Sequence, residues 1–232
     1  MRGEISTGRA AKRHPLDWYA EHGWEWEQIA QAIGLEPENE AGAIWDPACG
    51  FGHSLSRLQG IGFKGELLGS DLVENIAWED FEDQGRVEFR SLEFFFDGGN
   101  TLASDRAFVP PARCSIWCNP PYSYKKVDGE IISQAFARQA LRLATHRVVF
   151  LLPLKWLAGQ ARGQFLREYP PQQVLLFTQR PSMPPGDRIN LMGSRAYSGG
   201  MVDYCAVVWD VRAPTAPGET RTIWLPTLGG QA

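Results

Sequence analysis

Short apolar runs and amphipathic stretches alternate along most of the chain. The apolar runs predict strands at residues 43–45, 66–70, 87–89, 114–118, 147–152, 174–178 and 204–211. The run at 147–152 is almost continuously apolar, which is typical of a strand buried on both faces of a sheet. Apolar residues at helical spacing predict helices between these runs, over residues 16–34, 53–59, 130–144 and 157–169.

This alternation of strands and helices predicts an α/β fold with a doubly wound, mostly parallel sheet. The runs at 174–178 and 204–211 have no helical pattern between them, so we expect an antiparallel hairpin at the C-terminal end. Residues 221–225 can add an edge strand. The intervening segment, residues 180–200, is rich in Pro and Gly and has no pattern of its own. Loops of such length in compact domains are usually functional or mobile.

Length and composition are those of an ordinary globular protein. The 232 residues are 44% hydrophobic, which suits one domain with a proper core, and no apolar run of about 18 residues predicts a membrane span. We expect a flexible tail at residues 1–14, which can touch phosphate or simply fray, and a single domain at residues 15–232. The cysteines show neither disulfide nor metal spacing, so free thiols in a reducing cytoplasm are expected.

A nucleotide-type loop follows the first predicted strand. Residues 46–52 read Asp-Pro-Ala-Cys-Gly-Phe-Gly, and a predicted helix starts directly behind them. Gly50 and Gly52 allow the backbone to approach a ligand where a Cβ atom would collide. The loop lacks the Gly-x-Gly-x-x-Gly spacing of pyrophosphate sites and begins with an acid, Asp46. An acid there suits a ligand with an ammonium and a sulfonium group, as in S-adenosylmethionine.

A second acid ends the next predicted strand. Asp71 lies 19 residues after Gly52, where a carboxylate can accept hydrogen bonds from both hydroxyls of a ribose. The alternative is that Asp71 caps the N-terminus of a helix. Because the loop at residues 46–52 lies just upstream, we favour the ribose role.

A rigid polar and aromatic stretch, Asn-Pro-Pro-Tyr at residues 119–122, follows the fourth predicted strand. The side-chain oxygen of Asn119 and the carbonyl of Pro120 can accept the two N–H groups of an amine that turns tetrahedral during methylation. Pro120 and Pro121 fix φ at about −65°, which holds that carbonyl in advance. Tyr122 offers a face on which a base can stack. The alternative is a plain turn, which this composition also favours.

The two motifs, in this order and with Asn119 placed 73 residues after Asp46, resemble motifs of a known family. They are similar to the cofactor and catalytic motifs of S-adenosylmethionine-dependent adenine-N6 DNA methyltransferases, especially the compact enzymes of phages and prophages. The resemblance covers residues 18–210 and implies a Rossmann-like class I methyltransferase fold. It also implies that the segment around Tyr19 and Glu21 closes over the methionine end of the cofactor.

A further contact implied by the resemblance involves Glu93 and Phe94, after the third strand. In this family an acid at this position binds the adenine amine of the cofactor, and an aromatic ring lies beside that adenine. The chain departs from the family pattern at two places: His22 stands where the family has Pro, and Glu93 where it has Asp. Asp97 is a second candidate for that acid. The alternative is that the rings near Phe94 only fill the core.

These inferences define the expected site. The residues expected to bind S-adenosylmethionine are Tyr19, Glu21, Asp46, Pro47, Ala48, Cys49, Gly50, Gly52, Asp71, Leu72, Glu93 and Phe94. The expected catalytic residues are Asn119, Pro120, Pro121 and Tyr122. No metal is expected.

An adenine inside a duplex has to be flipped out before it can reach residues 119–122. We expect basic side chains beyond Tyr122 and in a substrate-facing loop, at about residues 179–200, to hold flanking phosphates. These side chains are Lys125, Lys126, Arg180, Arg188 and Arg195. Each can instead be an ordinary solvated charge. The net charge of −4 counts mildly against tight non-specific binding to DNA but leaves room for a local basic groove.

Other functions stay open at this point. The same Asn-Pro-Pro-Tyr stretch also resembles methyltransferases that act on exocyclic amines in RNA or on glutamine side chains of release factors, and the acidic charge balance suits a protein substrate. A non-catalytic subunit built on the cofactor fold is a further alternative. The presence of Asp46, Asp71, Asn119 and Tyr122 argues against it. The loop spacing and the Asn-Pro-Pro-Tyr stretch disfavour a nicotinamide dehydrogenase.

Overall fold

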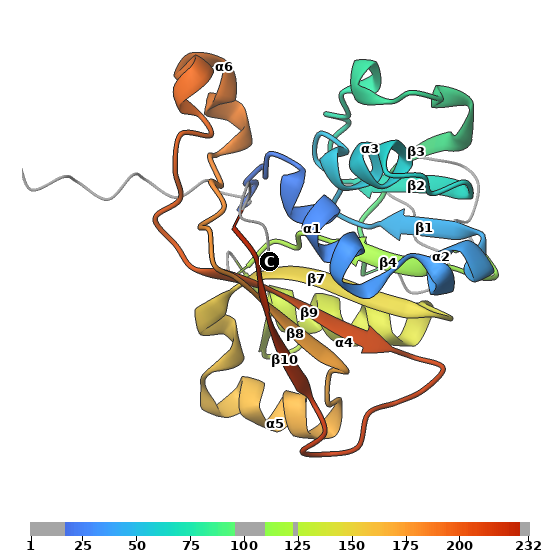
Figure 1. The fold of residues 1–232 in the computed structure, drawn as a ribbon, viewed down its shortest axis with the longest axis vertical. Helices are drawn as coiled ribbons and strands as arrows, with labels where there is room; N and C mark the ends of the chain where they lie inside the picture. The colour runs from blue at the N-terminus through green and yellow to red at the C-terminus, as the bar shows by residue number, and fades with distance from the viewer. Residues whose placement is uncertain (1–16, 96–109, 123–124, 228–232) are drawn as a thin grey trace, which may run out of the picture.

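An eight-stranded sheet forms the centre of the computed structural model, which describes residues 17–95, 110–122 and 125–227 (Figure 1). Its strands are β1 (Ala43–Asp46), β2 (Glu66–Asp71), β3 (Val87–Ser91), β4 (Ser115–Cys118), β7 (Arg147–Pro153), β8 (Gln173–Phe177), β9 (Tyr204–Asp210) and β10 (Arg221–Leu225). Their order across the sheet is β10-β8-β9-β7-β4-β1-β2-β3. The expected tail at residues 1–14 and the candidate acid Asp97 lie outside the described residues.

Neighbouring strands in this sheet are parallel except at β9, which runs antiparallel to both β7 and β8. The chain forms β8 before β9, yet β9 lies between β7 and β8, so the last long strand is inserted into the sheet. This arrangement confirms the mostly parallel sheet with a C-terminal antiparallel hairpin that the sequence predicts. The edge strand at residues 221–225 is confirmed too, because β10 pairs with β8.

Helices cover both faces of the sheet, as Figure 1 shows. They are α1 (Trp24–Ile33), α2 (Glu36–Ala41), α3 (His53–Gly60), α4 (Ile132–Leu143), α5 (Gln160–Glu168) and α6 (Ile189–Met192). Helices α1, α2 and α3 lie on one face, and α4 and α5 lie on the other. A small hairpin pairs β5 (Lys126–Val127) with β6 (Glu130–Ile131). Short 3₁₀ turns occupy Trp78–Asp80, Gln84–Arg86, Leu154–Leu157, Gly186–Arg188 and Gly193–Arg195.

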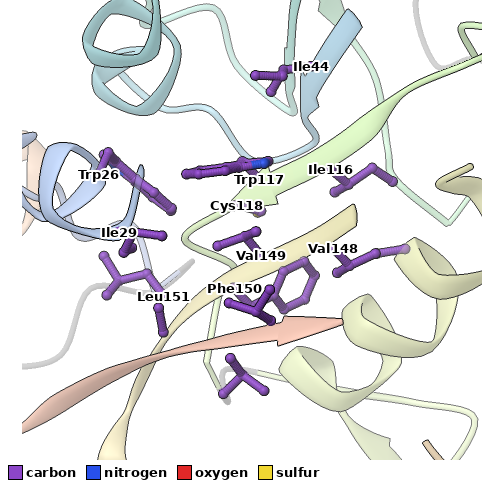
Figure 2. Close-up of a cluster of buried hydrophobic side chains, with 14 of the residues drawn as sticks. Trp26, Ile29, Ile44, Ile116, Trp117, Cys118, Val148, Val149, Phe150 and Leu151 are labelled. Carbon is purple, nitrogen blue, oxygen red and sulfur yellow. The ribbon is translucent and has the colours of Figure 1, made fainter. Parts of the chain in front are cut away.

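The core is aromatic where α1 meets the middle of the sheet. Figure 2 shows Trp26 and Ile29 of α1 beside Trp117 of β4, and the ring centroids of the two tryptophans lie 6.1 Å apart. All three side chains are fully buried. Every residue of β7 is buried as well, as its continuous apolar run predicts. Full burial of one large apolar side chain contributes about 1.5–3 kcal/mol, so this layer holds α1 firmly on the sheet.

A buried ion pair ties α2 to the sheet. Arg147 at the start of β7 lies 3.4 Å from Oε2 of Glu38 and donates a hydrogen bond of 3.0 Å to the carbonyl of Gly34. The other oxygen of Glu38 accepts a bond of 3.1 Å from Nε1 of Trp117. Burial raises the pKa of Glu38 and lowers the pKa of Arg147, and their mutual attraction opposes both shifts. Loss of either partner would leave the other charge buried and unpaired.

Two local expectations from the sequence are wrong. Residues 16–34 do not form one helix, because the described part is non-helical up to Gly23, whose φ is 105°, and α1 begins only at Trp24. The segment 180–200 is not structureless, because it contains α6 and two 3₁₀ turns. Residues 18–20 pair with residues 184–186 instead of continuing α1. Backbone pairing between distant segments leaves no periodic signal in either one.

Among the described residues, none of the helices has the length and apolar character needed to cross a membrane.

Candidate active site

Three neighbouring parallel strands end at one edge of the sheet, and their ends carry the polar residues of both motifs. Strand β1 ends at Asp46, β2 ends at Asp71, and β4 ends just before Asn119. A cavity of about 220 Å³ lies at this edge. It is lined by Asp17, Trp18, Tyr19, Ala20, Glu21, Pro47, Ala48, Cys49, Gly50, Phe51, His53, Asp71, Leu72, Val73, Asn75, Leu92, Glu93, Phe94, Asn119, Pro121, Ile132 and Phe136.

Ten of the twelve expected cofactor residues line this cavity, and the exceptions are Asp46 and Gly52. The carboxylate of Asp46 is buried behind the loop, where it accepts hydrogen bonds from the backbone N–H of Ala48, at 3.1 Å, and from the hydroxyl of Ser54. Burial raises the pKa of Asp46 to about 7, although the Ser54 bond acts in the opposite direction. Asp46 therefore shapes the loop that lines the cavity.

Asp71 links the loop to the end of β2. One of its oxygens accepts a hydrogen bond of 2.9 Å from the N–H of Gly50, and the other accepts one of 2.7 Å from the N–H of Leu72. Gly50 and Gly52 have φ values of 51° and 82°, which side chains rarely adopt, so glycine is required for this turn. Burial raises the pKa of Asp71, and the two backbone hydrogen bonds oppose that shift.

The charged side chains that line the cavity are acidic. Four carboxylates line it, those of Asp17, Glu21, Asp71 and Glu93, whereas none of the described lysines or arginines does. A cavity whose described lining carries four carboxylates and no lysine or arginine attracts a positively charged ligand and disfavours a pyrophosphate, although Lys125 offsets part of the charge of Glu93. The donor set therefore fits the ammonium and sulfonium groups of S-adenosylmethionine.

Glu93 and Phe94 both reach the cavity, and each also has a partner in the protein. The carboxylate of Glu93 lies 3.2 Å from Nζ of Lys125. The ring of Phe94 is 2% exposed and packs on Phe136, with ring centroids 4.7 Å apart. Phe94 is thus a core residue that also lines the cavity, so packing in the core and contact with a ligand are compatible roles for this ring.

The side-chain amide of Asn119 has a fixed orientation. Its nitrogen donates hydrogen bonds to the carbonyl of Tyr19, at 3.1 Å, and to Oε2 of Glu21, at 2.8 Å. Its oxygen accepts a hydrogen bond from the hydroxyl of Tyr122. Glu21 is itself held, because its other oxygen accepts a bond of 2.9 Å from Nε1 of Trp26 in α1. The amide nitrogen is fully used inside the protein, and the oxygen keeps one lone pair for another donor.

Tyr122 is positioned from α4. Its backbone carbonyl accepts a hydrogen bond of 2.7 Å from the hydroxyl of Ser133, and that hydroxyl accepts one of 3.0 Å from Nε1 of Trp156. The ring of Tyr122 is nearly parallel to that of Tyr19, with 13° between the planes and 6.5 Å between the centroids. Burial raises the pKa of Tyr122 well above its ordinary value, so its hydroxyl stays protonated.

Backbone pairing joins residues 184–186 to residues 18–20, which line the cavity. The N–H of Ala20 donates to the carbonyl of Pro184 at 3.0 Å, and the N–H of Gly186 donates to the carbonyl of Trp18 at 3.1 Å. A Cβ atom at Gly186 would lie 2.3 Å from the ring of Trp18, so only glycine allows this close approach. The segment at residues 18–20, which contacts Asn119 through Tyr19, and the segment at residues 184–186 are therefore joined to each other.

A second, larger hollow of about 1110 Å³, which we call the groove, shares Tyr19 with the cavity. Its lining includes both Tyr19 and Tyr122, so it leads to the Asn-Pro-Pro-Tyr stretch. Lys155, Arg162 and Arg195 line it, and among the described residues no Asp or Glu does. The groove is therefore locally cationic in a chain whose net charge is −4.

Only one of the five expected phosphate contacts lies in this groove, namely Arg195. Lys125 pairs with Glu93, and Arg180 pairs with Asp203 at 2.7 Å. Lys126 and Arg188 are exposed and do not line the groove. Lys155 and Arg162 were not expected in this place, because they follow β7 in the sequence and share a surface with residues 181–200 only in the folded chain.

The structure also reveals positioning residues that the sequence did not predict in these roles. Glu21 orients Asn119, and Ser133 with Trp156 holds the backbone of Tyr122. A serine inside a helix carries no local signal of such a bond, since its partner is distant in the sequence. In the described part of the chain, no group of His, Cys, Asp or Glu has the arrangement of a metal site. All four cysteines are buried and free.

Comparison with known proteins identifies the fold. The sequence matches no family model, and no curated protein is similar to it in sequence. Solved structures are similar in fold. A putative class I S-adenosylmethionine-dependent methyltransferase from Listeria monocytogenes has a TM-score of 0.56 and 14% identity, over 90% of this chain and 65% of that one.

Two further structures extend this similarity. The methyltransferase subunit of a type I restriction-modification system from Streptococcus thermophilus has a TM-score of 0.56 at 14% identity, over 83% of this chain and 44% of that one. A putative RNA methyltransferase from Pyrococcus horikoshii has a TM-score of 0.53 at 12% identity, over 88% and 92% of the two chains. The chain thus spans less than two thirds of the first two proteins. Its fold is that of the class I S-adenosylmethionine-dependent methyltransferases.

Proposed function

We propose that this chain is an S-adenosylmethionine-dependent methyltransferase that methylates N6 of adenine in DNA. The observation that carries the proposal is the fixed amide of Asn119. Its nitrogen is bound by Tyr19 and Glu21, so its oxygen faces away from them, toward Tyr122. An oxygen held in this way, next to an aromatic ring, is suited to accept an N–H of a planar exocyclic amine.

The cavity supports S-adenosylmethionine as the methyl donor. Its four carboxylates suit a ligand with two cationic groups, and Asp71 can accept ribose hydroxyls at the end of β2. Phe94 and Phe136 both line the cavity and give it apolar surface for an adenine ring. When bound, the cofactor supplies a methyl group that its sulfonium makes electrophilic. The Listeria structure of the same fold is described as S-adenosylmethionine-dependent, which agrees with this part of the proposal.

The chain's own residues then act on the acceptor. N6 of adenine is a poor nucleophile because its lone pair is delocalised into the ring. The Asn119 oxygen and the Pro120 carbonyl accept its two N–H groups and so stabilise the positive charge that develops on nitrogen. The new nitrogen–carbon bond forms as the carbon–sulfur bond breaks, and the cationic amine afterwards releases a proton to water. Tyr122 donates to Asn119 and stacks on the base.

The groove supports a nucleic acid as the polymer. Lys155, Arg162 and Arg195 provide positive charge in the groove that Tyr122 also lines, without an opposing acid in the described lining. Cations of this kind contact phosphates and fix the register of a strand. The Streptococcus thermophilus structure belongs to a restriction-modification methyltransferase, which favours DNA, whereas the Pyrococcus horikoshii structure belongs to a putative RNA methyltransferase.

Transfer of a labelled methyl group to unmethylated DNA, to RNA and to cell protein in parallel tests the proposal. We expect label in DNA. Label only in RNA or protein would replace the substrate while keeping the role of Asn119. Binding of S-adenosylmethionine by calorimetry, measured on the same preparation, addresses the non-catalytic alternative: cofactor binding without transfer to any of the three polymers would favour a binding subunit.

A further inference from the structure

The most exposed large apolar side chain among the described residues stands at the rim of the groove. Met201 is 95% exposed, and the adjacent Val202 is 43% exposed. Both line the groove that leads to Tyr122. Single exposed apolar residues are common on protein surfaces. Met201, however, lines a cationic groove, so a bound polyanion would contact it.

The backbone on both sides of Met201 is held by contacts with the rest of the protein. On one side, Gly200 packs directly on residues 180–181, since a Cβ atom there would lie 2.0 Å from the carbonyl oxygen of Pro181. On the other side, Asp203 is anchored twice: its side chain pairs with Arg180 at 2.7 Å, and its carbonyl accepts a bond of 2.8 Å from the N–H of Leu154. Strand β9 begins at the next residue. The exposed side chain therefore projects from between two anchors.

Reaching Asn119 requires an adenine to leave the helix. Tyr122, which adjoins Asn119, is only 9% exposed, so the reacting edge of the base must enter the inner end of the groove. Removing a base from a stack costs on the order of a few kcal/mol. Apolar side chains such as Met, Leu and Phe compensate part of this cost in other proteins by entering the space between base steps.

We infer that Met201 inserts into duplex DNA beside the flipped adenine and occupies the space that the base vacates. The inference rests on the proposed function and specifies its substrate as double-stranded. Charge complementarity supports this occupant, because Lys155, Arg162 and Arg195 line the same groove, where positive charge attracts the phosphates of a DNA strand. Figure 1 shows that helix α6, which precedes Met201 in the chain, stands away from the sheet.

The test compares Met201→Ala with wild type on two forms of one oligonucleotide that contains the target adenine. One form is a full duplex, and the other is the single strand, in which no base pair has to be opened. We expect Met201→Ala to reduce duplex methylation roughly tenfold more than single-strand methylation, and Met201→Leu to restore most of the difference. With 2-aminopurine in place of the target adenine, the fluorescence increase on binding should be smaller for Met201→Ala than for wild type.

Leu191→Ala is the matched control, because Leu191 is 84% exposed on α6 but does not line the groove. An equal loss in Leu191→Ala, or equal losses on both DNA forms in Met201→Ala, would overturn the inference. So would a wild-type enzyme that methylates only single strands. A wild-type enzyme that labels RNA or protein but neither form of DNA would refute the proposed function itself and, with it, the role of Met201.

Discussion

Glu21 accepts a hydrogen bond of 2.8 Å from the side-chain nitrogen of Asn119, which lies 98 residues further along the chain. The pair joins the segment that lines the cofactor cavity to the residue proposed to hold the acceptor amine. Trp26 occupies the other oxygen of Glu21 at 2.9 Å, so the carboxylate is bound on both sides. Glu21 thereby acts as a positioning residue for Asn119 in addition to lining the cavity.

Replacement of this carboxylate by an amide should disturb the pair. In Glu21→Gln, a single oxygen has to serve two donors, so either Trp26 or Asn119 faces an N–H₂ group. We expect kcat for methyl transfer to fall about 10- to 100-fold, as for the loss of one hydrogen bond to a charged group, with little change in KM for DNA. Glu27→Gln, at an exposed carboxylate paired with Arg57, is the control. Unchanged kcat in Glu21→Gln would remove the positioning role.

The architecture could be predicted from the sequence because each strand of the eight-stranded sheet and most helices carry their own local signal. The small hairpin of β5 and β6 was not predicted. The apolar run that became β7 and the strand–loop–helix around Asp46 predicted both the sheet and the site at its edge. The sequence could not predict that Tyr19 pairs with Pro185 or that Asp46 lies behind the loop, because those facts depend on packing between distant segments.

The same reason explains why, of the five basic residues expected at the substrate, only Arg195 lines the groove. Arg180 and Lys125 look like free cations in the sequence, yet folding brings a carboxylate to each of them. Lys155 lies in the 3₁₀ turn Leu154–Leu157 and Arg162 in α5, neither of which has a local relation to residues 180–200, and only the fold brings them into the groove. Charges are therefore assigned to a substrate surface more reliably after their partners are known.

Asp71 should contribute strongly to cofactor binding. Removal of its carboxylate in Asp71→Ala takes away the proposed acceptor of the ribose hydroxyls and the acceptor for Gly50, so we expect the dissociation constant for S-adenosylmethionine to rise about 10- to 100-fold. Asp71→Asn, which keeps one oxygen, should have a smaller effect. Calorimetry measures both constants, with the exposed Asp187→Ala as control. Wild-type affinity in Asp71→Ala would exclude the ribose role.

The groove cations predict a distinct salt dependence. Each phosphate contact contributes about 0.9 to the slope of the logarithm of the binding constant against the logarithm of salt concentration for duplex DNA. Lys155→Ala and Arg195→Ala should each reduce that slope by about one contact and weaken binding to all sequences alike. Arg180→Ala should change it less, because Asp203 already neutralises Arg180. The slope can be measured by fluorescence anisotropy, and equal slopes for all three variants and wild type would contradict the assignment.

Glu25 should make stability fall as pH rises. Its side chain is fully buried, and burial raises its pKa to about 8, with backbone hydrogen bonds opposing the shift. Between its ordinary pKa of 4.5 and about 8, the folded state holds a proton that the unfolded state releases, so the free energy of unfolding decreases with pH. Each unit of pKa difference corresponds to about 1.4 kcal/mol.

Glu25→Gln removes this dependence. We expect the variant to match wild type near pH 5 and to be more stable than wild type by a few kcal/mol at about pH 9. Urea unfolding at several pH values measures the difference, and Glu82→Gln, at an exposed position, should leave the pH profile as it is. A constant difference between Glu25→Gln and wild type at all pH values would show that Glu25 does not titrate in this range.

The most direct test of the proposed chemistry is nucleoside analysis of DNA after incubation with S-adenosylmethionine and either wild type or Asn119→Ala. The account predicts N6-methyldeoxyadenosine in DNA treated with wild type and none above background with Asn119→Ala, while calorimetry shows that the variant still binds the cofactor. Methylation at another atom of DNA, or normal formation of N6-methyldeoxyadenosine by Asn119→Ala, would contradict it.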